Sequence, residues 1–527
     1  MRFYLFLAAA FLWMSTASTS VAQDVSYPDG FNEPFPLFSK ALGPFTRTIS
    51  TENDRAQTYF NQGIQMMYAF TKVDAARSFR EAQKADTMCA ICHWGEAWAW
   101  GSYLNGPMTP DEAPRAYAAI QKAIALAPNG NEVEQALIEA MSHRYVADFK
   151  ADNRATQDSA YAEAMAGVAT LFPDDLDAGT LYGEALFLLE ARRGTRDVND
   201  PDVMRLHDVL EQVLAKDIRH PGACHLYIHA TESTQHPELA EACAEFLGDA
   251  IPGASHINHM PSHTFNQIGR WGDAVRGNIQ AWHSDQKAAV NEGFAIYPSH
   301  NLHMLLFAAS MDGQGAIAVQ AGRDYEKLTG NNFYTALTLV RFGRFEEIDQ
   351  LSARPDHGVY GGMWDFAKGY RALRKGDPDF ARVYGLRVLQ AADSSKASFR
   401  GHSAKNLLGT LGNVLLGEIE RSAGQLDAAE ALFKLAVAAE DQLDYDEPEP
   451  MPFAARHWLG ALLIERSDFA QAEQVFRDEL LSHPHNGWSL FGLLQALEGQ
   501  GKSDAAIRAD FEKSWARSDT WIRGARF

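Results

Sequence analysis

The sequence is poor in several features that mark common functional classes. Of its 527 residues only 47 are basic, against 68 acidic ones, so the formal net charge is −21, and no run of basic residues occurs. This composition argues against a nucleic-acid partner, because phosphate binding needs clustered Lys and Arg. The chain also lacks a Ser-His-Asp order, a phosphate-binding loop and a dinucleotide fingerprint. A strongly negative chain instead concentrates cations near its surface.

Long apolar runs are absent after the N-terminus, so we expect no stable membrane insertion of the mature protein. The first 22 residues contain a single Arg2, an apolar stretch and then small residues that end at Ala22. This order predicts a signal peptide that is removed after Ala22, because the apolar stretch is shorter than the roughly 20 residues of a membrane anchor. The sequence therefore predicts a periplasmic or secreted protein whose thiols meet an oxidising compartment.

What the chain does carry is a recurring pattern of small and aromatic residues between Ala404 and Ser518. Its first copy consists of Gly417, Gly424, Ala429, Phe433 and Ala436, and the next of Gly460, Phe469, Ala472, Phe476 and Pro484. This is the tetratricopeptide pattern, in which two antiparallel helices occupy about 34 residues and small residues stand where the helices touch. The pattern predicts an all-α fold, a tetratricopeptide-type helical solenoid of about twelve helix hairpins.

The same frame extends back to about residue 55 and divides the chain. We predict a signal peptide (1–22), an N-terminal extension (23–54), N-terminal repeats (55–220), histidine-rich repeats (221–328) and C-terminal repeats (329–527). The acidic stretch DEPEP at residues 446–450 is interpreted as an ordinary turn.

Histidine is infrequent, but 10 of the 18 histidines lie between His220 and His303. In the tetratricopeptide architecture the second, fifth and ninth places of each first helix line the concave groove. The glycine and alanine anchors of the repeats put His256, His259 and His263 at these three places. The preceding repeat has His225 and His229 at the fifth and ninth places, and the following repeat has His300 and His303 at the second and fifth.

These positions favour a shared metal site in the groove. Residues four apart share a helix face, and neighbouring first helices run side by side at about 8–10 Å. The predicted ligands are His225, His229, His256, His259, His263, His300 and His303, with Glu184 from a ninth place of an earlier repeat. Imidazole with occasional carboxylate suits copper, zinc or iron rather than magnesium or calcium. An open coordination position would allow a metal-dependent hydrolase or oxidoreductase.

Two other interpretations of the histidines stay open. The groove of such repeat arrays commonly holds a peptide or small-molecule ligand, so a metal-free interaction scaffold is the main alternative. Each histidine can also be an ordinary buried polar side chain. Metal analysis separates these interpretations.

The four cysteines form two pairs. Cys89 and Cys92 stand in CAICH, which has the order of a c-type haem attachment motif with His93 as proximal ligand. A disulfide between them and free or metal-bound thiols are the alternatives. Cys224 and Cys243 lie on opposite arms of one expected hairpin, and we predict a disulfide between them.

Several segments together resemble a known family. They are HPGACHLYIHATE, PGASHINHMPSHTF, YPSHNLHMLLFAASMDG, DTMCAICHWGEAWAWG and, further on, HPHNGWSLFGLLQALEGQG. They are similar to bacterial exported tetratricopeptide-repeat proteins, and the His-x-x-His-Met-Pro-Ser-His block is the most specific part. The resemblance implies a helical solenoid and treats the histidines as one unit, and it implies no particular reaction. Members of that family carry an aromatic residue at the position of His93, which sets this chain apart.

Overall fold

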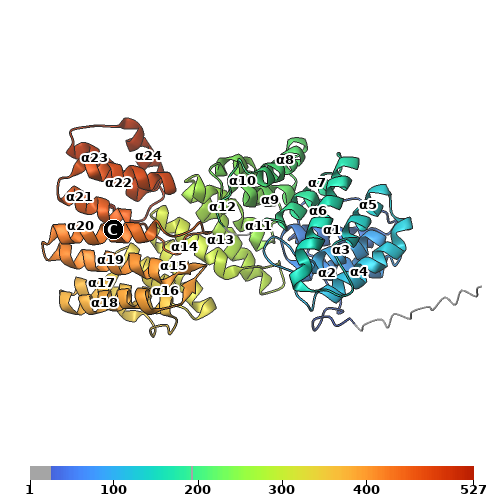
Figure 1. Cartoon of the computed structure of the whole chain (residues 1–527), viewed down its shortest axis with the longest axis horizontal. Helices are drawn as coiled ribbons and strands as arrows, with labels where there is room; N and C mark the ends of the chain where they lie inside the picture. Colours follow the sequence, from blue (N-terminus) through green and yellow to red (C-terminus); the bar gives the residue numbers. More distant parts are fainter. Residues whose placement is uncertain (1–24, 191–193) are drawn as a thin grey trace, which may run out of the picture.

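The computed structural model describes residues 25–190 and 194–527, so the predicted signal peptide lies outside the described residues. The chain is 66% helical, and the described residues form 24 α-helices that pair into twelve successive hairpins. One two-stranded ribbon, β1 (Ser398–Phe399) with β2 (His402–Ser403), joins two hairpins. The predicted all-α, tetratricopeptide-like solenoid is confirmed. In Figure 1 the hairpins follow one another along the long axis, from α1 at the right to α24 at the left.

The helices divide as the repeat frame predicts. The N-terminal repeats contain α1 (Asp54–Tyr68), α2 (Lys72–Ala85), α3 (Ala90–Trp100), α4 (Ala113–Leu126), α5 (Glu132–Ser142), α6 (Arg154–Leu171), α7 (Leu176–Phe187) and α8 (Pro201–Lys216). The histidine-rich repeats contain α9 (Pro221–Thr231), α10 (Glu241–Leu247), α11 (Ser255–His259), α12 (Pro261–Gln267), α13 (Trp271–Ala288), α14 (Pro298–Met311) and α15 (Gly315–Thr329).

The remaining helices build the C-terminal repeats. They are α16 (Phe333–Arg341), α17 (Gly358–Arg374), α18 (Pro378–Ser394), α19 (Ala404–Ser422), α20 (Leu426–Glu440), α21 (Arg456–Glu465), α22 (Phe469–Ser482), α23 (Gly487–Gly499) and α24 (Ala505–Trp515). Four short 3₁₀ helices lie in connections: Ala127–Asn129, Ala151–Asn153, Pro237–Ala240 and Phe345–Gln350.

Small residues let the helices of neighbouring hairpins approach one large ring. Phe476 of α22 is fully buried between Gly460 of α21 and Gly492 of α23. A Cβ atom would lie 2.3 Å from the Phe476 ring at Gly460 and 2.2 Å from it at Gly492, which no side chain tolerates. The glycine and phenylalanine signature of the sequence is therefore a packing requirement, and it fixes the spacing of the helices.

The N-terminal extension packs along the surface of two regions. The Phe38 ring meets the Phe294 ring edge-on at 5.6 Å, and Ala41 accepts a hydrogen bond from the backbone N–H of Gly253 at 2.8 Å. Tyr59 of α1 donates from its hydroxyl to the carbonyl of Phe35 at 2.7 Å. The extension thus ties the N-terminal repeats to the histidine-rich repeats.

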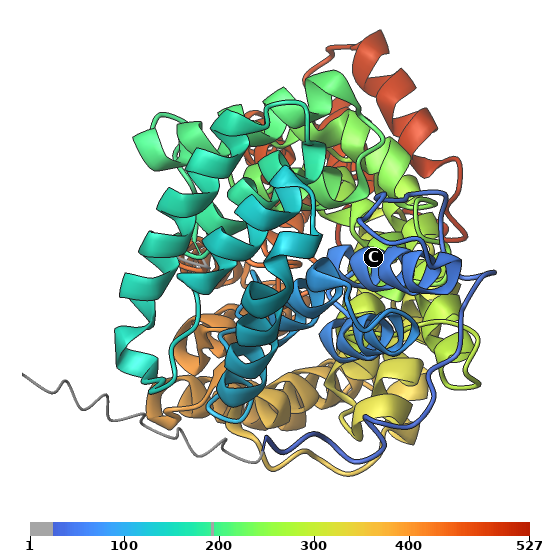
Figure 2. The ribbon, with the colours of Figure 1, turned by 90° about the vertical axis from the view of Figure 1, so that its right-hand side faces the viewer.

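The C-terminal repeats return to the histidine-rich repeats. Trp271 of α13 donates from its indole N–H to the carbonyl of Pro484 at 2.9 Å, and Trp488 of α23 donates to the carbonyl of Ser310 at 2.8 Å. Figure 2, seen from the N-terminal side, shows the helices arranged around the long axis. The groove side of α9 to α14 is consequently covered rather than open. Within the described ranges, we find no helix with the length and apolar character needed to span a bilayer.

Candidate metal centre

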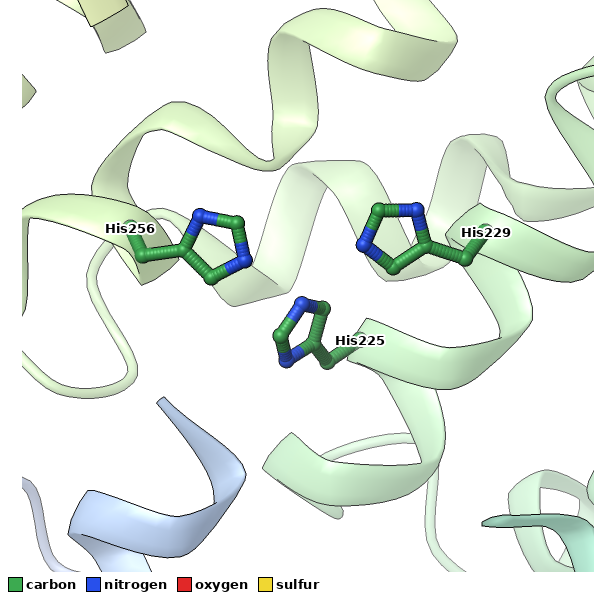
Figure 3. A group of neighbouring side chains, drawn as sticks. All are labelled: His225, His229 and His256. Carbon is green, nitrogen blue, oxygen red and sulfur yellow. The ribbon is translucent and has the colours of Figure 1, made fainter. Parts of the chain in front are cut away.

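Six of the seven predicted histidine ligands form two groups of three. Triad A consists of His225, His229 and His256, and triad B of His259, His263 and His300. Within each group one candidate ligand atom per residue lies within 4.8 Å of the others. The three side chains of triad A point toward one another from two helices (Figure 3).

Triad A leaves ring nitrogens unpaired in the protein interior. His225 and His229 lie one turn apart on α9, and His256 comes from the first turn of α11. His225 donates from Nδ1 to the carbonyl of Tyr68 at 2.6 Å, which leaves its Nε2 free to accept. In the described part of the chain, the Nε2 atoms of His225 and His229 and both ring nitrogens of His256 have no hydrogen-bond partner. Their side chains belong to residues only 1%, 5% and 2% exposed, so water does not satisfy them.

Triad B joins three consecutive segments of the repeat frame. His259 ends α11, His263 lies on α12 and His300 lies on α14. The Nε2 atoms of His259 and His263 lie 2.8 Å apart, and the His300 ring is centred 4.7 Å from the His259 ring. Asn278 of α13 bonds to Nδ1 of His259 through its Oδ1 atom at 3.0 Å, which assigns the proton to Nδ1. The Nε2 side of His259 is therefore the side that accepts a proton or an ion.

Glu232 connects the two triads, and sequence reasoning did not find it. Its carboxylate accepts from Nδ1 of His229 at 2.7 Å through one oxygen and from Nδ1 of His263 through the other. A carboxylate behind a ligating imidazole fixes the ring tautomer and orients Nε2 toward the ion. Glu232 follows the last residue of α9, so it lies one turn beyond His229 on the same side. That spacing of three residues is the pattern by which the sequence could have revealed it.

The interior keeps most of these histidines neutral, as metal ligation requires. Burial lowers the pKa of four histidines well below the usual value, and neighbouring imidazoles lower it further: His225, His256, His259 and His300. His263 differs, because the charge of Glu232 and its hydrogen bond raise the pKa of His263 in spite of burial. Burial alone would raise the pKa of Glu232, but His263 and His229 lower it overall.

The triads lie directly beside each other. The rings of His229 and His263 are centred 5.3 Å apart, and those of His256 and His259 are 5.5 Å apart. Phe70 covers triad A, with its ring centre 4.2 Å from that of His225 and 5.4 Å from that of His256. Phe70 has a left-handed backbone, with φ of 62°, at the turn after α1. The turn thus directs an apolar side chain onto the histidines.

A cavity of about 180 Å³ reaches both triads. His256 of triad A and both His263 and His300 of triad B line it, and Tyr297 and Glu447 also contribute. The Tyr297 ring meets the His256 ring edge-on at 5.6 Å. A small molecule in this cavity therefore contacts ligands of both triads.

The acidic stretch at 446–450 is part of this site, so its interpretation as an ordinary turn was wrong. Glu447 places a carboxylate oxygen 3.6 Å from Nδ1 of His263, and it groups with His229, Glu232 and His263. Arg400 holds the loop through two bonds of 2.6 Å to Asp446 and one of 2.7 Å to the carbonyl of Glu447. A second cavity of about 220 Å³ lies along the loop and also reaches His263. The sequence gave no indication of this contact, because the loop is remote from the histidines along the chain.

Two predicted ligands lie elsewhere and belong to neither triad. Of the nitrogens of His303, Nε2 bonds with the Tyr334 hydroxyl at 2.6 Å and with the carbonyl of Glu449 at 3.1 Å. Its ring stacks on Tyr334, because a residue three places after His300 is turned toward α16. Glu184 on α7 accepts the indole N–H of Trp98 at 2.8 and 3.1 Å. In the described chain, neither residue joins a metal-ligating group with the triads.

The cysteines are paired. Cys89 and Cys92 form a disulfide at the start of α3, with Cα atoms 5.4 Å apart, and Cys224 and Cys243 form one with Cα atoms 4.9 Å apart. Haem attachment needs both sulfurs of the first pair, which the disulfide occupies. Burial lowers the pKa of His93 to about 4. Covalent haem at Cys89, Cys92 and His93 stays a prediction for spectroscopy.

Comparisons with known proteins add no assignment. No family model and no curated protein matches the chain. Among solved structures it is similar to the TPR domain of P58(IPK), with 10% identity over 88% of this chain and 97% of that one, at a TM-score of 0.22. A human IFIT1 dimer with m7Gppp-AAAA has 10% identity over 87% and 96% at a TM-score of 0.30. The APC/C hetero-tetramer Cut9-Hcn1 has 11% over 88% and 97% at 0.25. Such low TM-scores carry no argument about function.

Proposed function

We propose that this chain is an exported tetratricopeptide-type metalloprotein that holds two transition-metal ions, one in each triad. The observation that supports this best is the set of unpaired ring nitrogens in triad A. Four nitrogen atoms of His225, His229 and His256 lie in the interior without a partner. One ion placed between the three rings would satisfy three of them at once.

Energetics disfavour packing as the whole explanation. A buried polar atom without a partner costs about 1–3 kcal/mol, so four such atoms are a large burden for a protein of ordinary stability. Alanine or leucine at these places would avoid that cost. Three imidazoles instead provide a donor set suited to copper, zinc or iron.

The main alternative is a metal-free interaction scaffold. The tetratricopeptide-like fold supports that function in general terms. A peptide bound at the histidine places would need those side chains at an open surface, yet five of the six triad residues are buried. The cavity of about 180 Å³ instead has room for a small molecule beside the proposed ions.

The proposed chemistry follows from the number of ligands. Three protein ligands leave a coordination position open, and this position would face the cavity that reaches both triads. An ion there activates water for hydrolysis, or oxygen species where the metal is redox-active. Export to an oxidising compartment is part of the proposal, and the two disulfides agree with it.

Elemental analysis of the protein purified without a histidine tag or chelating column tests the proposal. We expect two transition-metal ions per chain, restored after chelation by adding the same metal. His259→Ala and His263→Ala should each remove the ion of triad B. Protein that contains no stoichiometric metal and rebinds none would support the scaffold. A pyridine haemochrome spectrum of periplasmically expressed protein tests the haem alternative in the same sample.

A further inference from the structure

We infer that the two triads form one coupled dinuclear copper centre that binds dioxygen between its two ions. This inference rests on the proposed metal function, and it adds the identity of the metal, the cooperation of the two sites and the ligand. Three features carry it: the closeness of the triads, the absence of carboxylate within them, and the shared cavity.

The triads are too close to act separately. His229 of triad A and His263 of triad B bond to the same carboxylate, that of Glu232. Two further rings, of His256 and His259, lie one on each side of the boundary with centres 5.5 Å apart. Ions bound at the Nε2 side of each triad would be neighbours, with no helix between them.

The donor set favours copper(I) as the ion that both triads accept together. Each triad is made of histidine alone, and Glu232 and Glu447 approach the imidazoles from the Nδ1 side. Two divalent ions would repel each other four times as strongly as two monovalent ions at the same separation. Dinuclear sites for divalent ions commonly reduce that repulsion with ligating carboxylates. Copper is the first-row metal that imidazole sites bind most strongly and that also has a stable monovalent state.

Dioxygen balances the charge of the oxidised centre. Each copper(I) gives one electron, so the O–O bond order falls to one and a peroxide dianion bridges two copper(II) ions. Two monovalent ions carry a total charge of +2, and two divalent ions with a peroxide dianion also carry +2. No proton and no further reductant is needed. The interior therefore experiences no net change in charge when the ligand binds.

The surroundings suit a small, uncharged ligand. The cavity of about 180 Å³ is lined by His256 of triad A and by His263 and His300 of triad B, so one ligand reaches both ions. Phe70 stacks against His225 and His256 and keeps water from that side of triad A. Exclusion of water protects a reactive bound oxygen species.

Copper loading followed by oxygen exposure tests the inference. Apoprotein loaded anaerobically with copper(I) should bind two ions and then take up one O₂ per two copper ions, with a new intense near-ultraviolet absorption. The oxidised centre should give no copper(II) signal in electron paramagnetic resonance, because the two spins couple. The double variant His225→Ala/His229→Ala should bind one copper, show no such absorption and, once oxidised, give the full signal of one copper(II).

Each other outcome identifies which claim fails. Two copper ions that give two separate spins would overturn the coupled centre and leave the metalloprotein proposal standing. Two ions of zinc or iron with no binding of copper would have the same meaning. Absence of any bound metal would overturn both, and a wild-type circular dichroism spectrum of the double variant would show that it is folded.

Discussion

Buried histidines occur in two regions of this molecule, and their surroundings differ. In the C-terminal repeats His457 bonds to the Ser489 hydroxyl at 3.1 Å, and His483 lies between Glu479 at 2.6 Å and Glu449 at 3.1 Å. In the histidine-rich repeats His225, His229 and His256 keep unpaired nitrogens. The first set is satisfied by the protein, and the second needs a partner from outside it. Burial of histidine alone therefore does not indicate a ligand, whereas an unpaired nitrogen among other imidazoles does.

The hairpins of the two regions use their inner faces differently. In the C-terminal repeats the Phe476 ring fills the space between glycines of adjacent helices. In the histidine-rich repeats imidazoles occupy the inner face, and a cavity stays beside them. The first region stores stability in packing, and the second gives up packing for a binding site.

The largest effect is expected when a triad loses two ligands. His225→Ala with His229→Ala should reduce the bound metal from two ions to one, because a single imidazole retains an ion at least about 100-fold more weakly than three. Metal content by elemental analysis measures this. The matched control is His457→Ala with His483→Ala, which removes two buried histidines outside the triads and should keep both ions. Equal loss in both variants would contradict the distinction between the two regions.

Removal of a packing ring should affect stability alone. Phe476→Ala should lower the free energy of unfolding by about 3–5 kcal/mol, since it leaves a cavity between α21, α22 and α23. Chemical denaturation followed by circular dichroism measures the change, and metal content should stay at two ions. Leu481→Ala on the same helix alters a side chain of a residue that is 82% exposed, so it should change stability by less than about 0.5 kcal/mol.

Glu232→Gln should weaken metal binding at both triads without deleting a ligand. We expect affinities about 10–100-fold lower, because the amide no longer fixes the tautomers of His229 and His263 as an anion does. Competition with a chromogenic chelator measures the affinities. Glu238→Gln, which alters an exposed partner of His236, is the control and should have no effect. A weakening confined to one triad would show that Glu232 serves only that triad.

The smallest effect concerns a buried carboxyl of the histidine-rich repeats. Burial raises the pKa of Asp285 from 3.8 to about 6, although hydrogen bonds from Ser255 and Asn301 oppose the shift. The folded state therefore holds the proton more tightly than the unfolded state, so this contribution is complete below pH 4 and is lost as pH rises toward 6. Asp285→Asn should be more stable than wild type at pH 7, by on the order of 1 kcal/mol. Thermal unfolding at pH 5 and pH 7 tests this, and an advantage that did not grow with pH would refute it.

Much of the fold was predictable, because the repeat pattern records local contacts. The glycine and phenylalanine spacing describes pairs of helices adjacent in sequence, and the described chain forms the expected twelve hairpins. The expected first helices of the histidine-rich repeats begin at Pro221, Ser255 and Pro298, within one residue of the frame. That register placed six of seven histidines in the triads.

The parts that failed depend on contacts between distant segments. The pattern could not show that Glu447 approaches His263, since the two lie far apart in the chain. It also treated His303 and Glu184 as ligands, whereas Tyr334 and Trp98 provide their partners. These partners come from helices in other repeats, where the frame specifies spacing but not the side chain that faces it.

The sequence by itself determined the helical hairpins, their register and the concentration of imidazole on one inner face, because these follow from neighbours within about two repeats. The tertiary structure decided how the histidines divide into two triads, that one carboxylate serves both, and that a remote acidic loop covers them. The physical reason is that the curvature of a solenoid accumulates over many hairpins, so a loop after α20 meets helices α9 to α14 only once the whole array is folded.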